Sequence, residues 1–246
     1  AGYIIFPYVY KNSDAHTQLG IFGAASKIAM IMSMITQAFR YAYEPFVFGK
    51  ARDKDNKETY ARAMKFFIIF TLLAFLVVMG YMDVLRHIIG RDYWVGLEVV
   101  PIVMAGGIMT GVYFNLSFWY KLIDKTIWGA YFSGIGCAVI IGINVIFVPQ
   151  YGYIACAWAG FLGNATAMVL SYIVGQRKYP IDYPLKSIGA YVLIGGLFFA
   201  IISYTNANLS VAAALGINTL VIILFIAHVL YHDFPLQQLR KRFGKK

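Results

Sequence analysis

The feature that most constrains the fold is the recurrence of apolar runs long enough to cross a lipid bilayer. The cleanest is MKFFIIFTLLAFLVVMGYM, which contains one charged residue, Lys65. A helix needs about 20 apolar residues to span the hydrocarbon core. Seven such runs predict an all-α membrane protein, a polytopic bundle of transmembrane helices. They are Gly20–Phe48, Met64–Met82, Val99–Tyr120, Ile127–Val148, Ile154–Gly175, Ser187–Tyr204 and Val211–Tyr231.

The composition excludes several other classes of protein. Only 13% of the 246 residues are charged and 60% are hydrophobic, whereas soluble domains average about 25% charged residues. The two cysteines, Cys137 and Cys156, lie inside apolar runs, which indicates buried thiols and no disulfide framework or zinc site. Aromatic residues that accompany Lys and Arg fall at span ends, where aromatic belts form, so no nucleic-acid partner is expected.

The opening stretch AGYIIFPYVY is apolar but too short to span. Residues 1–10 are therefore predicted to be the end of a truncated helix, and the sequence is interpreted as a fragment of a longer protein. Residues 1–246 are predicted to form a single transmembrane domain. Residues 232–246 are predicted to be a basic tail.

The charges of the loops predict the orientation of the chain. The loops after the first, third, fifth and seventh runs carry sixteen of the 21 Lys and Arg residues, and the opposite side carries only Lys11, Arg86 and Arg91. Loops rich in Lys and Arg stay in the cytoplasm. The C-terminus is therefore predicted to be cytoplasmic, and anionic lipid of the inner leaflet is an expected partner of the basic loops.

Small residues recur along three of the runs. Gly107 and Gly111 form a GxxxG pair, and two further stripes are predicted to be Gly129, Ser133 and Cys137, and Gly160, Gly163 and Ala167. Such stripes allow helix backbones to approach closely. Static packing is the favoured interpretation, and sliding of helices during transport is the alternative.

No enzyme motif is present. The sequence lacks HExxH, GxSxG and GxxxxGK[ST], and its four histidines are scattered. We therefore expect no catalytic activity, no catalytic residue and no metal site.

The first run is unusual because it contains Lys27, Arg40 and Glu44, with Gln37 one turn before Arg40. Placing Lys or Arg near the bilayer centre costs roughly 2.5–3.5 kcal/mol each. With 1.5 Å of rise per residue, Lys27 lies about 10 Å outward and Arg40 about 9 Å inward of the middle. Glu44 has the i,i+4 spacing of a salt-bridge partner of Arg40.

Two interpretations of these charges remain open. Intramembrane charges often mark a path for a charged substrate, which makes Lys27, Gln37, Arg40 and Glu44 candidate substrate-binding residues. Alternatively, Arg40 and Glu44 form a packed pair at the membrane interface, and Lys27 extends to the headgroups.

The stretch LGIFGAASKIAMIMSMITQAFRYAYEPFVF, followed by a basic loop and ETYARAMKFF, resembles the C-terminal half of bacterial oligosaccharide and polysaccharide flippases of the Wzx type. These belong to the multidrug/oligosaccharidyl-lipid/polysaccharide exporter superfamily. The matching positions are Gly20 to Phe22, Lys27, Gln37 to Arg40, and Glu44 to Phe46. Phe22 departs from the family, in which Tyr is usual there.

The resemblance implies one lobe of a two-lobe flippase of the bacterial inner membrane, with the N-terminal lobe missing. Its expected substrate and partner is a lipid-linked oligosaccharide on undecaprenyl diphosphate, for surface polysaccharide such as O-antigen. No cofactor is implied beyond a coupling ion, H⁺ or Na⁺. The alternatives are a cation-coupled multidrug exporter of the same superfamily and a membrane-embedded glycan polymerase or acyltransferase.

Overall fold

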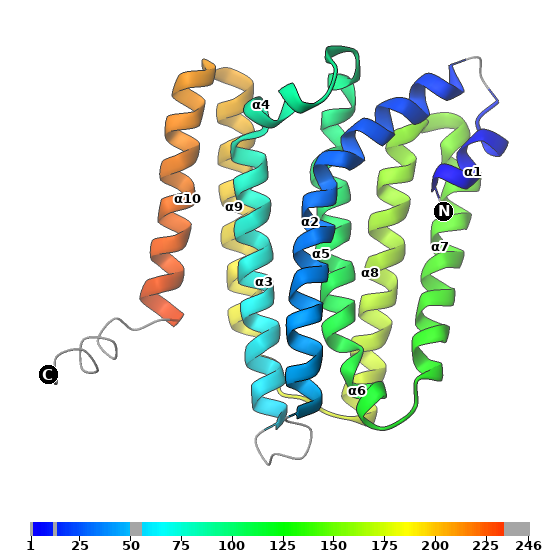
Figure 1. The fold of residues 1–246 in the computed structure, drawn as a ribbon, viewed down its shortest axis with the longest axis vertical. Coiled ribbons are helices and arrows are strands. Elements are labelled where there is room, and N and C mark those ends of the chain that lie inside the picture. Colours follow the sequence, from blue (N-terminus) through cyan, green and yellow to red (C-terminus); the bar gives the residue numbers. More distant parts are fainter. Residues whose placement is uncertain (1, 12–13, 50–55, 234–246) are drawn as a thin grey trace, which may run out of the picture. The chain divides into compact units, whose positions relative to one another are not determined.

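The computed structural model describes residues 2–11, 14–49 and 56–233, and every regular element among them is helical (Figure 1). The predicted tail from residue 234 onward and the loop cations Lys50, Arg52 and Lys54 lie outside these residues. The elements are α1 (Gly2–Val9), α2 (Ala15–Gly49), α3 (Asn56–Gly80), α4 (Met82–Leu85), the 3₁₀ helices η1 (Arg86–Ile88) and η2 (Arg91–Val99), α5 (Val100–Leu116), α6 (Phe118–Leu122), α7 (Ile127–Tyr151), α8 (Tyr153–Lys178), α9 (Leu185–Asn208) and α10 (Val211–Asp233).

Seven segments of the described chain are long and apolar enough to cross a bilayer. Each corresponds to one predicted run, and the third comprises Arg91–Leu122. The prediction of an all-α polytopic bundle is therefore confirmed. The short helix α1 covers most of the predicted remnant at residues 1–10.

The predicted end of the fourth run at Val148 is too early. Helix α7 continues through Pro149 to Tyr151 and ends at Gly152, whose backbone has φ 55° and ψ −136°. A proline in the last turn removes only one backbone hydrogen bond, so it does not stop the helix at once. Gly152 reverses the chain into α8 with a positive φ, which glycine adopts without steric cost.

The chain divides into two compact units, which are described separately. Unit 1 comprises residues 1–71 and 86–184, and unit 2 comprises residues 72–85 and 185–246. In unit 1, α2 packs on α5, α5 packs on α8, and α8 packs on α7. These helices run side by side in Figure 1.

Glycines set the closest helix contacts of unit 1. A Cβ on Gly107 would lie 2.9 Å from the side chain of Met32, so α5 approaches α2 as the GxxxG pair predicts. A Cβ on Gly136 would lie 2.9 Å from the carbonyl oxygen of Gly163, where α7 meets α8 backbone to backbone. The predicted stripe on the fourth run is therefore displaced, because Gly136 makes the contact and Cys137 is exposed.

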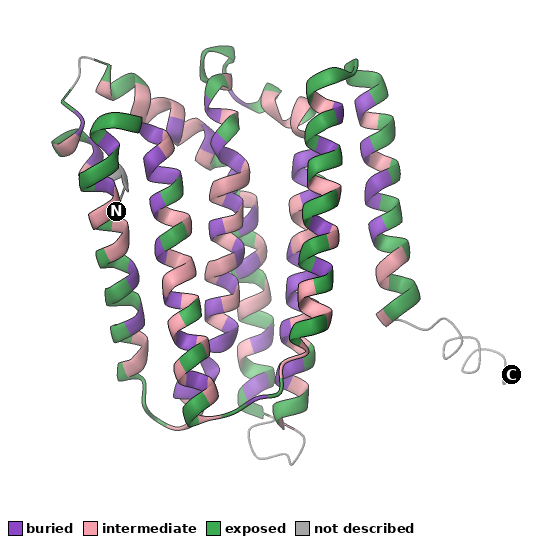
Figure 2. Cartoon of the chain, turned by 180° about the vertical axis from the view of Figure 1, so that it is seen from behind, coloured by how far each residue is buried: buried purple, intermediate pink, exposed green. Residues whose placement is uncertain are grey.

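Exposed residues occur along the spanning helices of both units (Figure 2), and many of them are large and apolar. Leu193 is 76% exposed, Ile146 62% and Leu220 61%. A water-soluble protein rarely exposes so much apolar surface, whereas lipid tails cover such a surface in a bilayer. The exposure pattern agrees with a multi-pass membrane protein.

Unit 2 contains a buried polar group that we call the amide cluster: Thr205, Asn206 and Asn218, with the backbone carbonyls of Met79 and Gly80. Asn218 Nδ2 donates to Gly80 O at 3.0 Å and to Asn206 Oδ1 at 2.7 Å. Thr205 Oγ1 donates to Asn218 Oδ1 at 2.6 Å, and Asn206 Nδ2 donates to Met79 O at 3.1 Å. The cluster joins α9 and α10 to the last turn of α3.

Candidate functional site

The charged residues at the end of α2 meet a lysine from α6. Glu44 Oε1 accepts a hydrogen bond from Lys121 Nζ at 2.7 Å, and Glu44 Oε2 lies 3.6 Å from Arg40 Nε. The i,i+4 pair expected from the sequence is therefore present, but the shorter contact is to Lys121. All three side chains are about one third exposed. We call them the charge triad.

A break between α5 and α6 precedes Lys121. At Ser117 the backbone N–H donates to Tyr113 O at 2.9 Å, and the hydroxyl donates to Phe114 O at 2.6 Å. The serine hydroxyl competes for a carbonyl of the helix, which favours a bend. Helix α6 follows as a separate short helix that carries Lys121.

A groove with a volume of about 310 Å³ opens beside the charge triad, near the lower limit of ligand sites in proteins. Arg40 and Lys121 line it, together with the aromatic rings of Phe114 and Phe118. The Arg40 guanidinium carbon lies 4.9 Å from the centre of the Phe114 ring, and Lys121 Nζ lies 5.1 Å from that of Phe118. The two cations therefore lie against aromatic faces, which stabilise them by cation–π attraction.

Hydroxyl-bearing residues form another part of the lining of the groove, which we call the hydroxyl wall. Tyr120 donates to the Tyr113 hydroxyl at 3.5 Å, and the hydroxyls of Tyr113 and Ser133 are 3.1 Å apart. Tyr113 also lies 3.3 Å from Gly129 O. This wall comes from the consecutive helices α5, α6 and α7, whereas Arg40 comes from α2, which is far away in the sequence.

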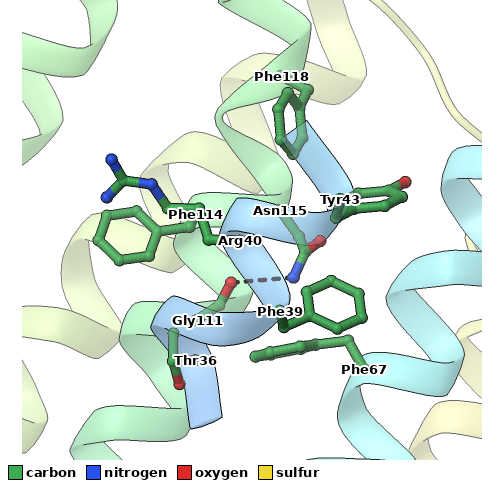
Figure 3. A pocket seen from close by; sticks show the side chains of 9 residues that line it. All are labelled: Thr36, Phe39, Arg40, Tyr43, Phe67, Gly111, Phe114, Asn115 and Phe118. Atoms are coloured by element: carbon green, nitrogen blue, oxygen red, sulfur yellow. Dashed lines mark hydrogen bonds between the residues drawn. The ribbon is translucent and has the colours of Figure 1, made fainter. Parts of the chain in front are cut away.

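A smaller cavity of about 10 Å³ adjoins Arg40 (Figure 3). Its lining includes Thr36, Arg40 and Asn115, and each of these residues has a buried polar atom without a hydrogen-bond partner. The atoms are Thr36 Oγ1, Arg40 Nε and Asn115 Oδ1. Asn115 Nδ2 donates to Gly111 O at 3.1 Å within its own helix, as the dashed line in Figure 3 shows. Such a volume has room for about one water molecule.

The other two predicted site residues lie elsewhere. Lys27 and Gln37 are exposed and line neither the groove nor the small cavity. Of the four substrate-binding candidates, the structure brings together Arg40 and Glu44. An ideal helix places Lys27 and Arg40 roughly 140° apart, which agrees with their different surroundings.

Lys121 was not among the candidate residues predicted from the sequence, because it follows the third run and was assigned only to the sixteen loop cations that predict the orientation. Glu44 and Lys121 are 77 residues apart in the chain. The available signal was their common membrane side: Glu44 lies near the end of the first run and Lys121 directly follows the third, and both runs end on the side rich in Lys and Arg. A carboxylate at one span end and a lysine at another are natural partners on the same side.

The charge triad and groove suit binding of an anion. Two cations and one carboxylate give the triad a formal charge of +1, and guanidinium and ammonium groups form strong hydrogen bonds with phosphate or carboxylate oxygens. Among the described residues, no three His, Cys, Asp or Glu side chains gather in a way that would hold a metal ion. The hydroxyl wall can exchange hydrogen bonds with a polar, uncharged part of the same ligand.

No family model, curated protein or solved structure that was compared with the chain matches it. The function is therefore inferred from the residues of this sequence and from the geometry of the groove.

Proposed function

We propose that the protein is one lobe of a flippase that carries lipid-linked oligosaccharide across the bacterial inner membrane, for synthesis of surface polysaccharide. The observation that carries the proposal is the groove of about 310 Å³ that is lined both by Arg40 and Lys121 and by the hydroxyl-bearing residues Tyr113, Tyr120 and Ser133. The diphosphate of an undecaprenyl-linked sugar would bind the two cations. The first sugar would lie along Phe114, Phe118 and the hydroxyls of Tyr113 and Tyr120.

The distribution of charge supports a location of the groove on the cytoplasmic side. The groove lies where α2 and α5 end, and the loops that follow these helices are on the side with sixteen cations. The positive-inside rule assigns that side, with the C-terminus, to the cytoplasm. A lipid-linked sugar that is assembled in the cytoplasm would enter the groove from the inner leaflet.

The physical need for such a groove is clear. A diphosphate and a glycan lose their hydration in hydrocarbon, and an unpaired ion in a medium of low dielectric constant is very unfavourable. Two cations that already lie in the membrane, partly neutralised by Glu44, replace part of that hydration. Transport then requires movement of the substrate and no chemical step.

The multidrug exporter of the same superfamily is less well supported. Binding of a cationic drug favours a carboxylate that is free to pair with it. Both oxygens of Glu44 already lie within ion-pair distance of cations, Lys121 and Arg40.

Binding of undecaprenyl diphosphate to the chain in nanodiscs tests the proposal. Arg40→Gln and Lys121→Gln should each weaken binding by about tenfold, because a hydrogen bond to a charged group contributes roughly 1.5–3 kcal/mol. Undecaprenol, which lacks the phosphates, should bind weakly to every variant. The affinities are measured by titration with a fluorescent analogue of the lipid.

Lys27→Gln is the matched control, because Lys27 is a cation of the same helix that lies outside the groove. Its affinity should remain within twofold of that of the wild type. Equal losses for Lys27→Gln and Arg40→Gln would show that the lipid responds to the charge of α2 as a whole, and the groove assignment would then be wrong.

The transport step is tested in the cell that produces the protein. Arg40→Gln should reduce the surface glycan at an unchanged protein level, with lipid-linked sugar accumulating in the inner leaflet. Unchanged glycan at the surface would contradict the proposed function.

A further inference from the structure

A second group of cations lies at the other end of α5 from the groove. Helices η1 and η2 precede α5, which begins at Val100, whereas the groove residues Tyr113 to Ser117 lie at its far end. Because α5 belongs to a membrane-spanning segment, the two ends of this helix face opposite leaflets. Residues 86–99 therefore lie at the headgroup level of the leaflet opposite the groove.

One face of η2 packs closely against α2 within unit 1. A Cβ on Gly96 would lie 2.8 Å from the carbonyl oxygen of Ile21, so only glycine allows η2 to approach α2 this closely. On the same segment, Glu98 accepts a hydrogen bond of 2.5 Å from the Tyr153 hydroxyl. This contact occupies the Glu98 carboxylate and ties η2 to the start of α8.

The segment also exposes apolar side chains, although the ring of Tyr93 lies beside Gly20 of α2. Ile88 is 76% exposed, Val95 66% and Tyr93 40%. Ile88 lies just before the third spanning segment, and Tyr93 and Val95 lie in its first two turns, so all three are at the edge of the bilayer that surrounds the bundle. Apolar and aromatic side chains at this depth enter the boundary between the headgroups and the acyl chains.

Trp94 organises the cations of the segment. Its indole N–H donates to Arg86 O at 3.0 Å, which fixes the orientation of the ring. The guanidinium carbon of Arg86 lies 4.6 Å from the ring centre and that of Arg91 lies 6.0 Å from it. Two guanidinium groups are thus held beside one indole. Arg91 is exposed and forms no ion pair with any other described residue.

We propose that Arg86, Arg91 and Trp94 form a binding site for the headgroup phosphate of an anionic phospholipid, with Ile88 and Val95 inserted among the acyl chains. Guanidinium groups bind phosphate oxygens in a bidentate geometry. Both guanidinium carbons lie within 6.0 Å of the Trp94 ring centre, and the indole occupies the headgroup layer, which tryptophan prefers. The site is independent of the proposed flippase activity, because it uses none of the groove residues.

The depth of the segment is tested by fluorescence quenching in phosphatidylglycerol nanodiscs that contain brominated lipid. The emission of Trp94 is obtained as the difference between the wild type and Trp94→Phe. Bromines close to the headgroup should quench this emission more strongly than bromines close to the methyl end. No quenching by either lipid, or stronger quenching by the deep bromines, would overturn the placement.

The phosphate site is tested by titration of the detergent-solubilised protein with fluorescent phosphatidylglycerol or phosphatidylcholine. A cation near an anionic lipid headgroup contributes enough for about a fivefold change in affinity. Arg91→Gln should therefore weaken binding of phosphatidylglycerol about fivefold, and Arg86→Gln with Arg91→Gln about 25-fold. Arg62→Gln, which removes an exposed cation that pairs with Glu58, should leave the affinity unchanged.

Three results would overturn the site: equal binding of the double variant and the wild type, an equal loss for Arg62→Gln, or equal affinity of the wild type for the two lipids. Melting temperatures of all variants are recorded, so that a loss of binding is compared only among folded proteins.

Discussion

Two regions of the molecule differ in how far their buried polar atoms are hydrogen-bonded. One is the charge triad with its neighbouring cavities in unit 1, and the other is the amide cluster in unit 2. In the amide cluster, each oxygen or nitrogen of the Asn218 amide has a partner within 3.0 Å. Beside the groove, Thr36 Oγ1, Arg40 Nε and Asn115 Oδ1 are buried without a hydrogen-bond partner. Buried polar atoms that are satisfied stabilise a fold, whereas unsatisfied ones reduce stability and often mark a site that binds something.

The largest expected effect comes from a pair of identical substitutions in the two regions. Asn218→Leu should lower the free energy of unfolding by about 2–3 kcal/mol, because it removes the hydrogen bonds of Asn218 with Thr205, Asn206 and the Gly80 carbonyl. Asn115→Leu should change it by less than about 1 kcal/mol, because among the described residues the Asn115 side chain hydrogen-bonds only to Gly111 O of its own helix. Thermal unfolding in nanodiscs measures both.

Asn208→Leu is the control for the asparagine pair. Asn208 is exposed, and within the part of the chain that the structure describes its side chain hydrogen-bonds only to Tyr204 O of its own helix, so the change should stay within about 0.5 kcal/mol. If Asn115→Leu were as destabilising as Asn218→Leu, the contrast between the two regions would be wrong.

Glu44→Gln is expected to strengthen binding of undecaprenyl diphosphate. The carboxylate competes with the ligand for Lys121 and Arg40, and a partly exposed ion pair of this kind contributes up to about 1 kcal/mol. Its removal should therefore raise the affinity up to about fivefold. Glu58→Gln removes the carboxylate of an exposed pair outside the groove and should have no effect. Weaker binding by Glu44→Gln would mean that the carboxylate orients the cations instead of competing with the ligand.

The smallest expected effects concern two threonines, whose substitution by valine should change the free energy of unfolding in opposite directions. Thr205→Val should lower the free energy of unfolding by about 1 kcal/mol, because Thr205 donates to Asn218. Thr36→Val removes a buried hydroxyl that has no partner and should raise it by about 0.5 kcal/mol. Chemical unfolding curves in mild detergent resolve the sign. A clear fall for Thr36→Val would indicate that the hydroxyl has a partner such as a bound water.

The spans and the Arg40–Glu44 pair were predictable because both depend on local sequence. Apolar runs of about 20 residues specify membrane helices, and i,i+4 spacing places two side chains on one helix face. The approach of α5 to α2 was also predictable, because Gly107 lies in a recognisable GxxxG pair.

The remaining parts of the site depend on contacts between distant segments. The rotation of α2 against α5 and α6 determines which cations share the groove. The periodicity of a single helix therefore does not show that Arg40 and Lys121 line it and that Lys27 does not. The mid-span Asn164 illustrates the same limit. Its side chain donates to Gly106 O at 3.3 Å across the α5–α8 contact. The sequence alone does not distinguish such a hydrogen bond between helices from a contact with a substrate.

The close approach of Gly136 to Gly163 has a consequence for genetic screens. Helix α7 carries Ser133 on the groove wall less than one turn before Gly136. A random mutation of either glycine to a larger residue would push α7 away from α8 and move that wall. In a screen for the proposed transport activity, such mutants would be scored as defective although neither glycine lines the groove, so the two positions are expected to appear in a loss-of-function map as false members of the proposed binding site.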